Sequence, residues 1–191
     1  RDGLALLHFR DGRYLDFFRR RVRLHERFGT LEEMKTALIQ AAKAEPPSEQ
    51  ALLDVTRFFE ITVELDEHVK WLRELVKAVP QVEDYRWDLV RALLDHEGAS
   101  EAAQLLDERL KNDGSDLPGI VLLRCEADLR VADSEAAVKR LTKLLAAQPG
   151  IEVEKQVLAF AQTRALDAVI VQILRARVDR EPQKAEAVFE L

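Results

Sequence analysis

The amino-acid sequence contains an internal repeat, and this repeat limits the fold more than any other feature of the chain. The tetrapeptide SEAA occupies residues 100–103 and recurs unchanged at residues 134–137, an offset of 34 residues (134 − 100). The same interval connects a ladder of glutamates: Glu33, Glu67, Glu101 and Glu135. A second ladder consists of helix breakers: Pro46, Pro80, Gly114 and Pro182, with Pro149 one residue beyond its slot. Helix-starting acids and helix breakers that share one period are typical of stacked helical repeats.

The period divides the chain into five units of one pattern. The units cover residues 15–48, 49–82, 83–116, 117–150 and 151–184, and partial repeats occupy residues 1–12 and 185–191. Each unit predicts a helix, a short turn, a second helix and a break, because apolar residues recur at helical spacing on both sides of the turn. Turns this short between two helices require the helices to be antiparallel. We therefore expect an all-α fold and a single repeat domain over residues 1–191, and the cut repeats at both ends predict a longer parent protein.

Polar residues at the start of several predicted helices indicate N-caps. Thr30 precedes Glu33 by three residues, the spacing of a capping box, and Gly29 tolerates the left-handed conformation that ends a helix. Four further residues are predicted to cap later helices: Ser48, Asp66, Ser100 and Ser134. Between the caps, inward-facing residues such as Leu72 and Leu106 are expected to bury the seams between units.

Composition and charge narrow the functional class. Hydrophobic residues make up 47% and charged residues 34% of the chain, which excludes a disordered protein and suits a helical one. The formal net charge of −6 argues against a general nucleic-acid binder, because phosphate groups require a cationic surface. No stretch approaches the roughly 20 apolar residues of a membrane span, and no signal peptide is visible. The single cysteine is compatible with a reducing compartment, and the expected location is cytoplasmic. The one cysteine, Cys125, cannot form an internal disulfide, and we expect it to be a small apolar packing residue.

No constellation of residues predicts catalysis. His25-Glu26 and His96-Glu97 begin like the zinc-binding helix of metalloproteases, but neither has a second histidine four residues after the first. The sequence also lacks a phosphate-binding glycine loop and a G-x-S-x-G nucleophile elbow. His68 falls in a helix-packing position and is expected to be structural. The sequence therefore predicts a protein that is not an enzyme and that uses neither a metal nor another cofactor.

These features resemble the tetratricopeptide repeat (TPR) family. The resemblance rests on the 34-residue helix-turn-helix period, on the Glu-Ala pair that opens the second helix and on the proline that closes it, and it covers residues 15–184. The small residue that the family prefers midway along the first helix is replaced in all five units, by Val22, Thr56, Val90, Arg124 and Leu158. The resemblance implies a right-handed α-α superhelix, or solenoid, whose first helices line a concave groove.

The resemblance also implies which residues face this groove. They are Arg19, Arg23, Arg27, Leu53, Arg57, Glu60, Trp87, Arg91 and Leu94, with Glu26 and Lys155 nearby. Arg23, Arg57 and Arg91 occupy one position of successive units, 34 residues apart, and Cys125 interrupts the row in the fourth unit. A row of guanidinium groups can grip an extended acidic peptide through bidentate pairs with its carboxylates.

A solvated helix face is the alternative explanation of these arginines, and the sequence favours it. This alternative predicts pairs with acids on the same helix: Asp54 with Arg57, Asp88 with Arg91 and Arg91 with Asp95. Such exposed pairs contribute only about 0.3–0.5 kcal/mol each. The six arginines of residues 13–27 form a basic patch with the same two explanations, a solvated face or a surface that steers an acidic partner or nucleic acid.

Three functions are open at this point. The leading hypothesis is a protein-interaction scaffold that holds a peptide or partner protein, acidic in character, in the concave groove. The second is a regulatory or recruiting arm of a larger multidomain enzyme or of a secretion or assembly machine. The third and weakest is RNA binding through the basic patch. No membrane contact is predicted for this segment, and pairing of the cut array ends leaves homo-oligomerisation open.

Overall fold

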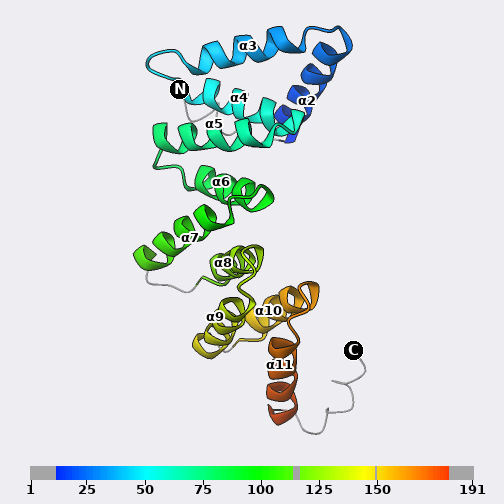
Figure 1. Ribbon diagram of the computed structural model, residues 1–191, viewed down its shortest axis with the longest axis vertical. Helices are drawn as coiled ribbons and strands as arrows, with labels where there is room; N and C mark the ends of the chain where they lie inside the picture. The colour runs from blue at the N-terminus through cyan, green and yellow to red at the C-terminus, as the bar shows by residue number, and fades with distance from the viewer. Residues whose placement is uncertain (1–11, 114–116, 149, 181–191) are drawn as a thin grey trace. The chain divides into compact units, whose positions relative to one another are not determined.

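A computed structural model describes residues 12–113, 117–148 and 150–180. Over these ranges the chain forms ten α-helices and no strand, which confirms the expected all-α class (Figure 1). The trailing partial repeat and the leading one up to residue 11 lie outside the described residues, as do the breakers Gly114, Pro149 and Pro182. The chain divides into two compact units, residues 1–92 and 93–191.

Within the described residues, the first unit contains four complete helices and most of a fifth. Its helices are α2 (Gly12–Arg27), α3 (Leu31–Ala42), α4 (Glu49–Thr62), α5 (Leu65–Ala78) and α6 (Glu83–Asp95), whose last turn belongs to the second unit. α4 contacts α2, α3 and α5, so its apolar face is enclosed from several sides. Phe18, Phe58 and Phe59 are among the fully buried side chains of this core. The apolar face of α4 therefore organises the first unit.

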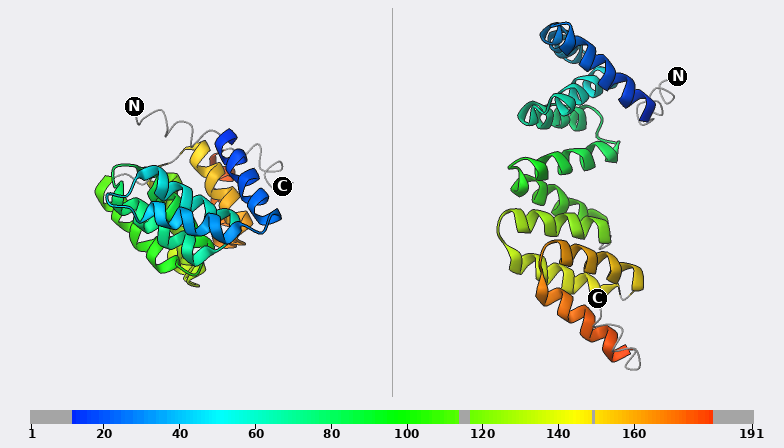
Figure 2. Two further views of the ribbon diagram at one scale, coloured as in Figure 1. Left: turned by 90° about the horizontal axis from the view of Figure 1, so that it is seen from above. Right: turned by 90° about the vertical axis from the view of Figure 1, so that its right-hand side faces the viewer.

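The second unit contains α7 (Ala99–Asp113), α8 (Pro118–Arg130), α9 (Ser134–Ala147), α10 (Ile151–Thr163) and α11 (Asp167–Arg180). Consecutive helices pack side by side, and α10 also contacts α8 while α11 contacts α9 (Figure 2). Leu141, Leu144 and Val157 lie in its core together with Cys125. Cys125 is fully buried and is therefore an apolar core residue, as expected from the sequence. This burial raises the pKa of its thiol to about 12.

One backbone hydrogen bond closes the turn inside all five helix pairs. In each turn a backbone N–H donates to the carbonyl five residues earlier, at 2.9 to 3.1 Å, from Thr30, Glu64, Gly98, Asp133 and Leu166. In four of these turns the preceding residue is left-handed, namely Gly29, Val63, Ala132 and Ala165, with φ of 71°, 59°, 62° and 53°. This is the Schellman arrangement that satisfies carbonyls at a helix end. The left-handed stop predicted at Gly29 is confirmed, and the same geometry recurs where no glycine is present.

The shared turn also explains which predicted N-caps are correct. Ser48, which follows a different loop, caps α4 as predicted: its Oγ accepts a hydrogen bond from the Ala51 N–H at 3.0 Å. The second helix of each pair starts directly after the residue that donates the turn's hydrogen bond. Asp66, Ser100 and Ser134 therefore fall inside the first turn of their helices, and their predicted capping role was wrong.

Two of the five cap positions show what the side chains do instead. The capping box at Thr30 was wrong, because the Thr30 side chain makes no cap hydrogen bond, and its Oγ1 lies 2.8 Å from His25 Nδ1. At the start of α9, Asp133 is the cap, and its carboxylate accepts a hydrogen bond from the Ala136 N–H at 3.0 Å. The turn geometry thus assigns the cap position, and the side chain present there decides whether a cap bond forms.

Arg124 shows how the chain accommodates a large residue in the slot where the TPR family prefers a small one. Its side chain is 9% exposed, and its Nε donates to Asp107 at 2.9 Å while Nη1 pairs with Asp128. Arg140 also pairs with Asp128, at 2.8 Å. A buried guanidinium is tolerated only when carboxylates compensate it, and α7, α8 and α9 each contribute to this network.

Candidate functional site

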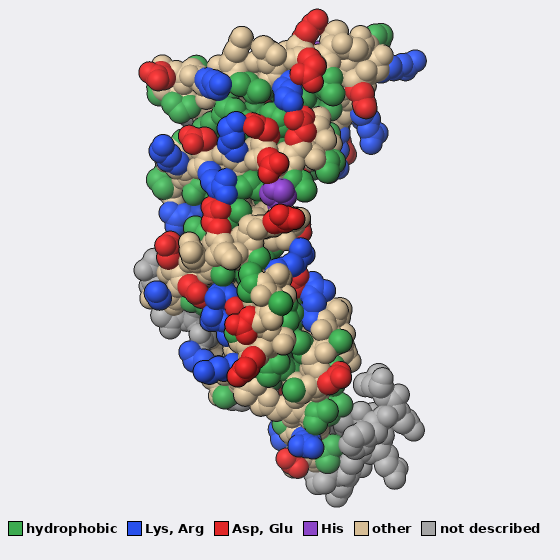
Figure 3. Space-filling view, in the orientation of Figure 1, with side chains coloured by type: hydrophobic (Ala, Val, Ile, Leu, Met, Phe, Trp, Pro, Cys, Tyr) green, Lys and Arg blue, Asp and Glu red, His purple; other side chains and the backbone are tan. Residues whose placement is uncertain are grey.

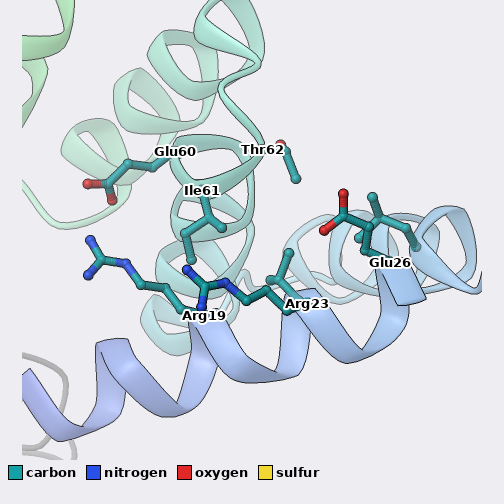
Figure 4. A pocket seen from close by; sticks show the side chains of 8 residues that line it. Arg19, Arg23, Glu26, Glu60, Ile61 and Thr62 are labelled. Atoms are coloured by element: carbon teal, nitrogen blue, oxygen red, sulfur yellow. The ribbon is translucent and has the colours of Figure 1, made fainter. Parts of the chain in front are cut away.

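A pocket of about 510 Å³ opens in the first unit between α2, the start of α3 and the end of α4 (Figure 4). We call it the α2–α4 pocket, and its lining consists of Arg19, Val22, Arg23, Glu26, Leu31, Glu60, Ile61 and Thr62. Arg19, Arg23 and Glu60 are predicted groove residues, and Glu26 was expected beside them. The pocket thus brings together charged side chains from two helices that the sequence placed on one surface.

Helical spacing positions the charged groups on α2. Arg19, Arg23 and Glu26 follow one another at intervals of four and three residues, so they lie on one face of the helix. Val22 is 4% exposed and forms part of the apolar floor. Figure 4 shows Arg19 and Arg23 extending from α2 toward the last turn of α4, where Glu60 lies. The pocket therefore has a charged rim over an apolar base.

The two arginines of the pocket are weakly engaged within the protein. Arg23 forms no ion pair or side-chain hydrogen bond with any described residue. Arg19 makes only a 4.0 Å contact with Asp16, and these two side chains are 49% and 68% exposed. Glu60, in contrast, is paired with Arg57. Two permanently charged guanidinium groups are therefore available to a ligand, with Glu26 as the remaining acid on the rim.

The other two members of the arginine row lie in a charged cluster formed by α4, α5 and α6. Arg91 pairs with Asp88 at 2.9 Å, as predicted for a solvated helix face, and Arg57 pairs with Glu60. Burial raises the pKa of Asp88 and lowers the pKa of His68, which lies within the electrostatic reach of Arg57, Glu60 and Asp88. Arg57 and Arg91 are thus occupied by intramolecular pairs, unlike Arg23.

Asp54, the residue predicted to pair with Arg57, is engaged with another helix. Its carboxylate accepts a hydrogen bond from the Tyr14 hydroxyl at 2.6 Å and one from Gln50 at 2.8 Å. The Tyr14 bond links α2 to α4, and burial followed by this bond raises the pKa of Tyr14. Asp54 therefore helps to hold the two walls of the pocket together.

The remaining predicted groove residues lie outside the α2–α4 pocket. Leu53 and Leu94 are 4% and 5% exposed, so they pack inside the protein and offer no surface to a partner. Arg27 is exposed at the end of α2, Trp87 is half-buried on α6 and Lys155 is exposed on α10. Leu31, Ile61 and Thr62 were not predicted as site residues, because their place in the pocket depends on where α3 begins and α4 ends.

Charge on the first unit is mixed. Basic and acidic side chains are interspersed over the face of α4 and α5 visible in Figure 3. Among the described residues, no group of three or more His, Cys, Asp and Glu side chains could hold a metal ion. Within the same part of the chain, every helix is too short or too polar to cross a membrane.

Comparison with known proteins identifies the fold. The chain matches no protein-family model and no curated protein sequence. Among solved structures it is similar to MamA, with a TM-score of 0.51 and 13% identity over 85% of this chain and 95% of that one. It is also similar to a Podosopora anserina protein described as a kinesin light chain with nearly identical TPR-like repeats, with a TM-score of 0.53 and 16% identity over 88% and 97% of the two chains. The chain therefore has a TPR-like helical repeat fold.

Proposed function

We propose that this protein is a protein-interaction scaffold and that the α2–α4 pocket binds an acidic segment of a partner protein. The proposal rests on the lack of strong ion pairs at the two arginines of the pocket. Arg23 has no ionic partner among the described residues, and Arg19 has only a long, exposed contact. A TPR-like fold supports the general class, because repeat arrays of this kind expose extended surfaces for partners.

The lining of the pocket matches an acidic peptide with an apolar side chain. Two guanidinium groups on successive turns of α2 can each bind a carboxylate by donating two parallel hydrogen bonds to it. Below them, Leu31 and Ile61 provide the apolar contact that desolvates such pairs and makes them stronger. An acidic segment with one apolar anchor therefore satisfies both halves of the pocket.

The alternatives from the sequence are supported less well. A recruiting arm of a larger enzyme or assembly machine would use the same pocket, and it differs only in what the rest of a parent protein does. RNA binding is disfavoured by the net charge of −6, because an RNA strand carries a charge at every phosphate and requires a more cationic surface.

A charge-reversal pair on α2 tests the proposal. The double variant R19E/R23E is expected to weaken binding of a blocked acidic peptide with a central leucine by about tenfold or more. Fluorescence anisotropy of the labelled peptide gives the affinities. R20E/R21E is the matched control, because both residues are exposed on the same helix, outside the pocket, and the net charge changes equally. Equal losses in both variants, or none in R19E/R23E, would remove the pocket from consideration.

A further inference from the structure

The first unit contains a second pocket that shares no residue with the first. This α3–α5 pocket has a volume of about 570 Å³ and lies between the end of α3, the loop before α4, and α5. Its polar and aromatic lining is Lys43, Lys70, Trp71, Glu74 and Lys77, and its apolar lining includes Pro47 and Leu52. Its volume lies in the usual range of ligand-binding clefts, about 300–1,000 Å³.

The charge of the α3–α5 pocket is opposite to that of the chain. Three lysines face one glutamate there, whereas the whole protein has a formal net charge of −6. Lys43 and Lys77 form no ion pair or side-chain hydrogen bond with described residues. Lys70 pairs with Glu67 at 2.8 Å, and its ammonium group lies 5.9 Å from the centre of the Trp71 ring. A local positive site on an acidic protein selects for an anionic ligand.

Trp71 adds a second, independent observation. Its side chain is 5% exposed, and its indole nitrogen has no hydrogen-bond acceptor among the described residues. An indole N–H can only donate, so the missing partner is an acceptor such as a carbonyl or carboxylate oxygen. A buried donor without an acceptor is rare in folded proteins and carries a desolvation cost. Because Trp71 also lines the α3–α5 pocket, a ligand bound there changes the surroundings of its ring.

We propose that the α3–α5 pocket is a second docking site, which takes an acidic peptide segment of a partner protein. Lys43 and Lys77 bind its carboxylates, and Pro47 and Leu52 contact an apolar side chain of the same segment. The same segment lies beside Trp71, which also lines the pocket. The apolar lining favours a peptide side chain, and the net charge of −6 disfavours a nucleic acid, which carries a charge at every backbone phosphate. This site is independent of the α2–α4 pocket, and the first unit would present two docking surfaces.

Tryptophan fluorescence tests the proposal directly. The chain has two tryptophans, Trp71 and Trp87, and Trp87 lies outside both pockets, so Trp71 is the only reporter in a W87F background. Titration with the blocked acidic peptide is expected to change the Trp71 emission in a saturable manner. K43E/K77E should weaken this response by about tenfold or more. R19E/R23E carries the same change in net charge and should leave it within about threefold.

The outcomes separate the two sites. Loss of the Trp71 response in K43E/K77E alone supports the α3–α5 site even if the α2–α4 pocket fails its own test. Because both sites take the same peptide, the anisotropy comparison of R19E/R23E with R20E/R21E is made in the K43E/K77E background, where only the α2–α4 pocket is intact. An unchanged emission on peptide addition, or an equal effect of the two double variants, would overturn the proposal. So would equal binding of a peptide whose acids are replaced by their amides, or tighter, lysine-dependent binding of a single-stranded RNA oligomer. If circular dichroism shows that K43E/K77E does not fold, K43Q/K77Q replaces it with the same expected direction.

Discussion

Val63 adopts a backbone conformation that its side chain disfavours. Its φ of 59° lies in the left-handed region, where the Cβ of an L-residue approaches the following carbonyl oxygen and a β-branched residue is a steric outlier. Gly29 occupies the equivalent turn of the first helix pair without this penalty. The Val63 side chain is 71% exposed, so packing does not compensate for the conformation. The six-to-one hydrogen bond from Glu64 to Phe59 and the two flanking helices hold it there.

The variant Val63→Gly is therefore expected to raise the free energy of unfolding by about 0.5–1 kcal/mol. The substitution removes a steric cost of about 1–2 kcal/mol from the folded state. Glycine also favours the unfolded chain, but only by about 0.4–1 kcal/mol. Urea unfolding followed by circular dichroism measures the change. Ala132→Gly is the control, since alanine at φ 62° carries a smaller penalty and its replacement should be nearly neutral. A stability loss in Val63→Gly would mean that an interaction of the valine side chain outweighs the backbone term.

Side chains reveal only some of these turn positions in advance. Gly29 predicted a left-handed stop because that conformation selects for glycine, whereas Ala132 and Ala165 carry no such signal. The cap at the start of α9 failed for a related reason. A backbone hydrogen bond fixes where the helix begins, so the cap position fell on Asp133, one residue before the predicted Ser134. A capping side chain in the sequence locates a helix start to within a residue or two.

On the scale of helices, hydrophobic spacing predicted the buried seams but not the width of the buried face. Leu72 and Leu106 were expected to point inward and are 2% and 0% exposed. Leu53 was assigned to a groove from its position on α4, yet Leu52 and Leu53 are both in the core. The reason is that α4 packs against α2, α3 and α5 at once. The pattern of one helix does not show how many neighbours enclose it.

Truncation of a seam residue measures what this packing contributes. Leu106→Ala is expected to lower the free energy of unfolding by about 2–5 kcal/mol, because its fully buried side chain would leave a cavity. Leu24→Ala serves as the control, since Leu24 is 53% exposed, and its effect should stay below about 0.5 kcal/mol. Thermal and urea unfolding give both values. Similar values for the two variants would contradict the assignment of Leu106 to the seam.

The junction of α4, α5 and α6 predicts a pH dependence. Burial favours the neutral imidazole and lowers the pKa of His68 below its ordinary value of 6.5, against the opposing effect of Glu60 and Asp88. As pH falls, the unfolded chain therefore protonates His68 before the folded protein does. The contribution of neutral His68 to the free energy of unfolding is fully present above about pH 6.5, and it is lost as pH falls through the lower pKa of the folded state. Urea unfolding at several pH values should show a smaller decline for His68→Gln than for the native protein. Identical pH profiles would show that this imidazole is not desolvated.

At the scale of the whole molecule, the period predicted the helix pairs but not the division into two compact units. The boundary between Ala92 and Leu93 falls inside α6, with no glycine or proline to mark it. The two parts of α6 differ in the residues that their side chains pack against. Tyr85 belongs to the first core, whereas Leu93 lies against Gly98, where an added Cβ would be 2.5 Å from the Leu93 side chain. A uniform sequence period cannot carry that information, because it repeats the same residue classes on both sides of the boundary.

Hydrogen exchange can decide whether the two units unfold separately or as one array. Leu141→Ala removes a fully buried side chain from the second core, and Leu75→Ala does the same in the first. In a stack stabilised mainly by neighbouring contacts, each variant should accelerate amide exchange in its own unit and leave the other within about threefold. Mass spectrometry of peptic fragments from α3, α4, α9 and α10 gives the comparison. Equal acceleration in all four helices by both variants would instead establish a single cooperative domain, as the uniform period predicts.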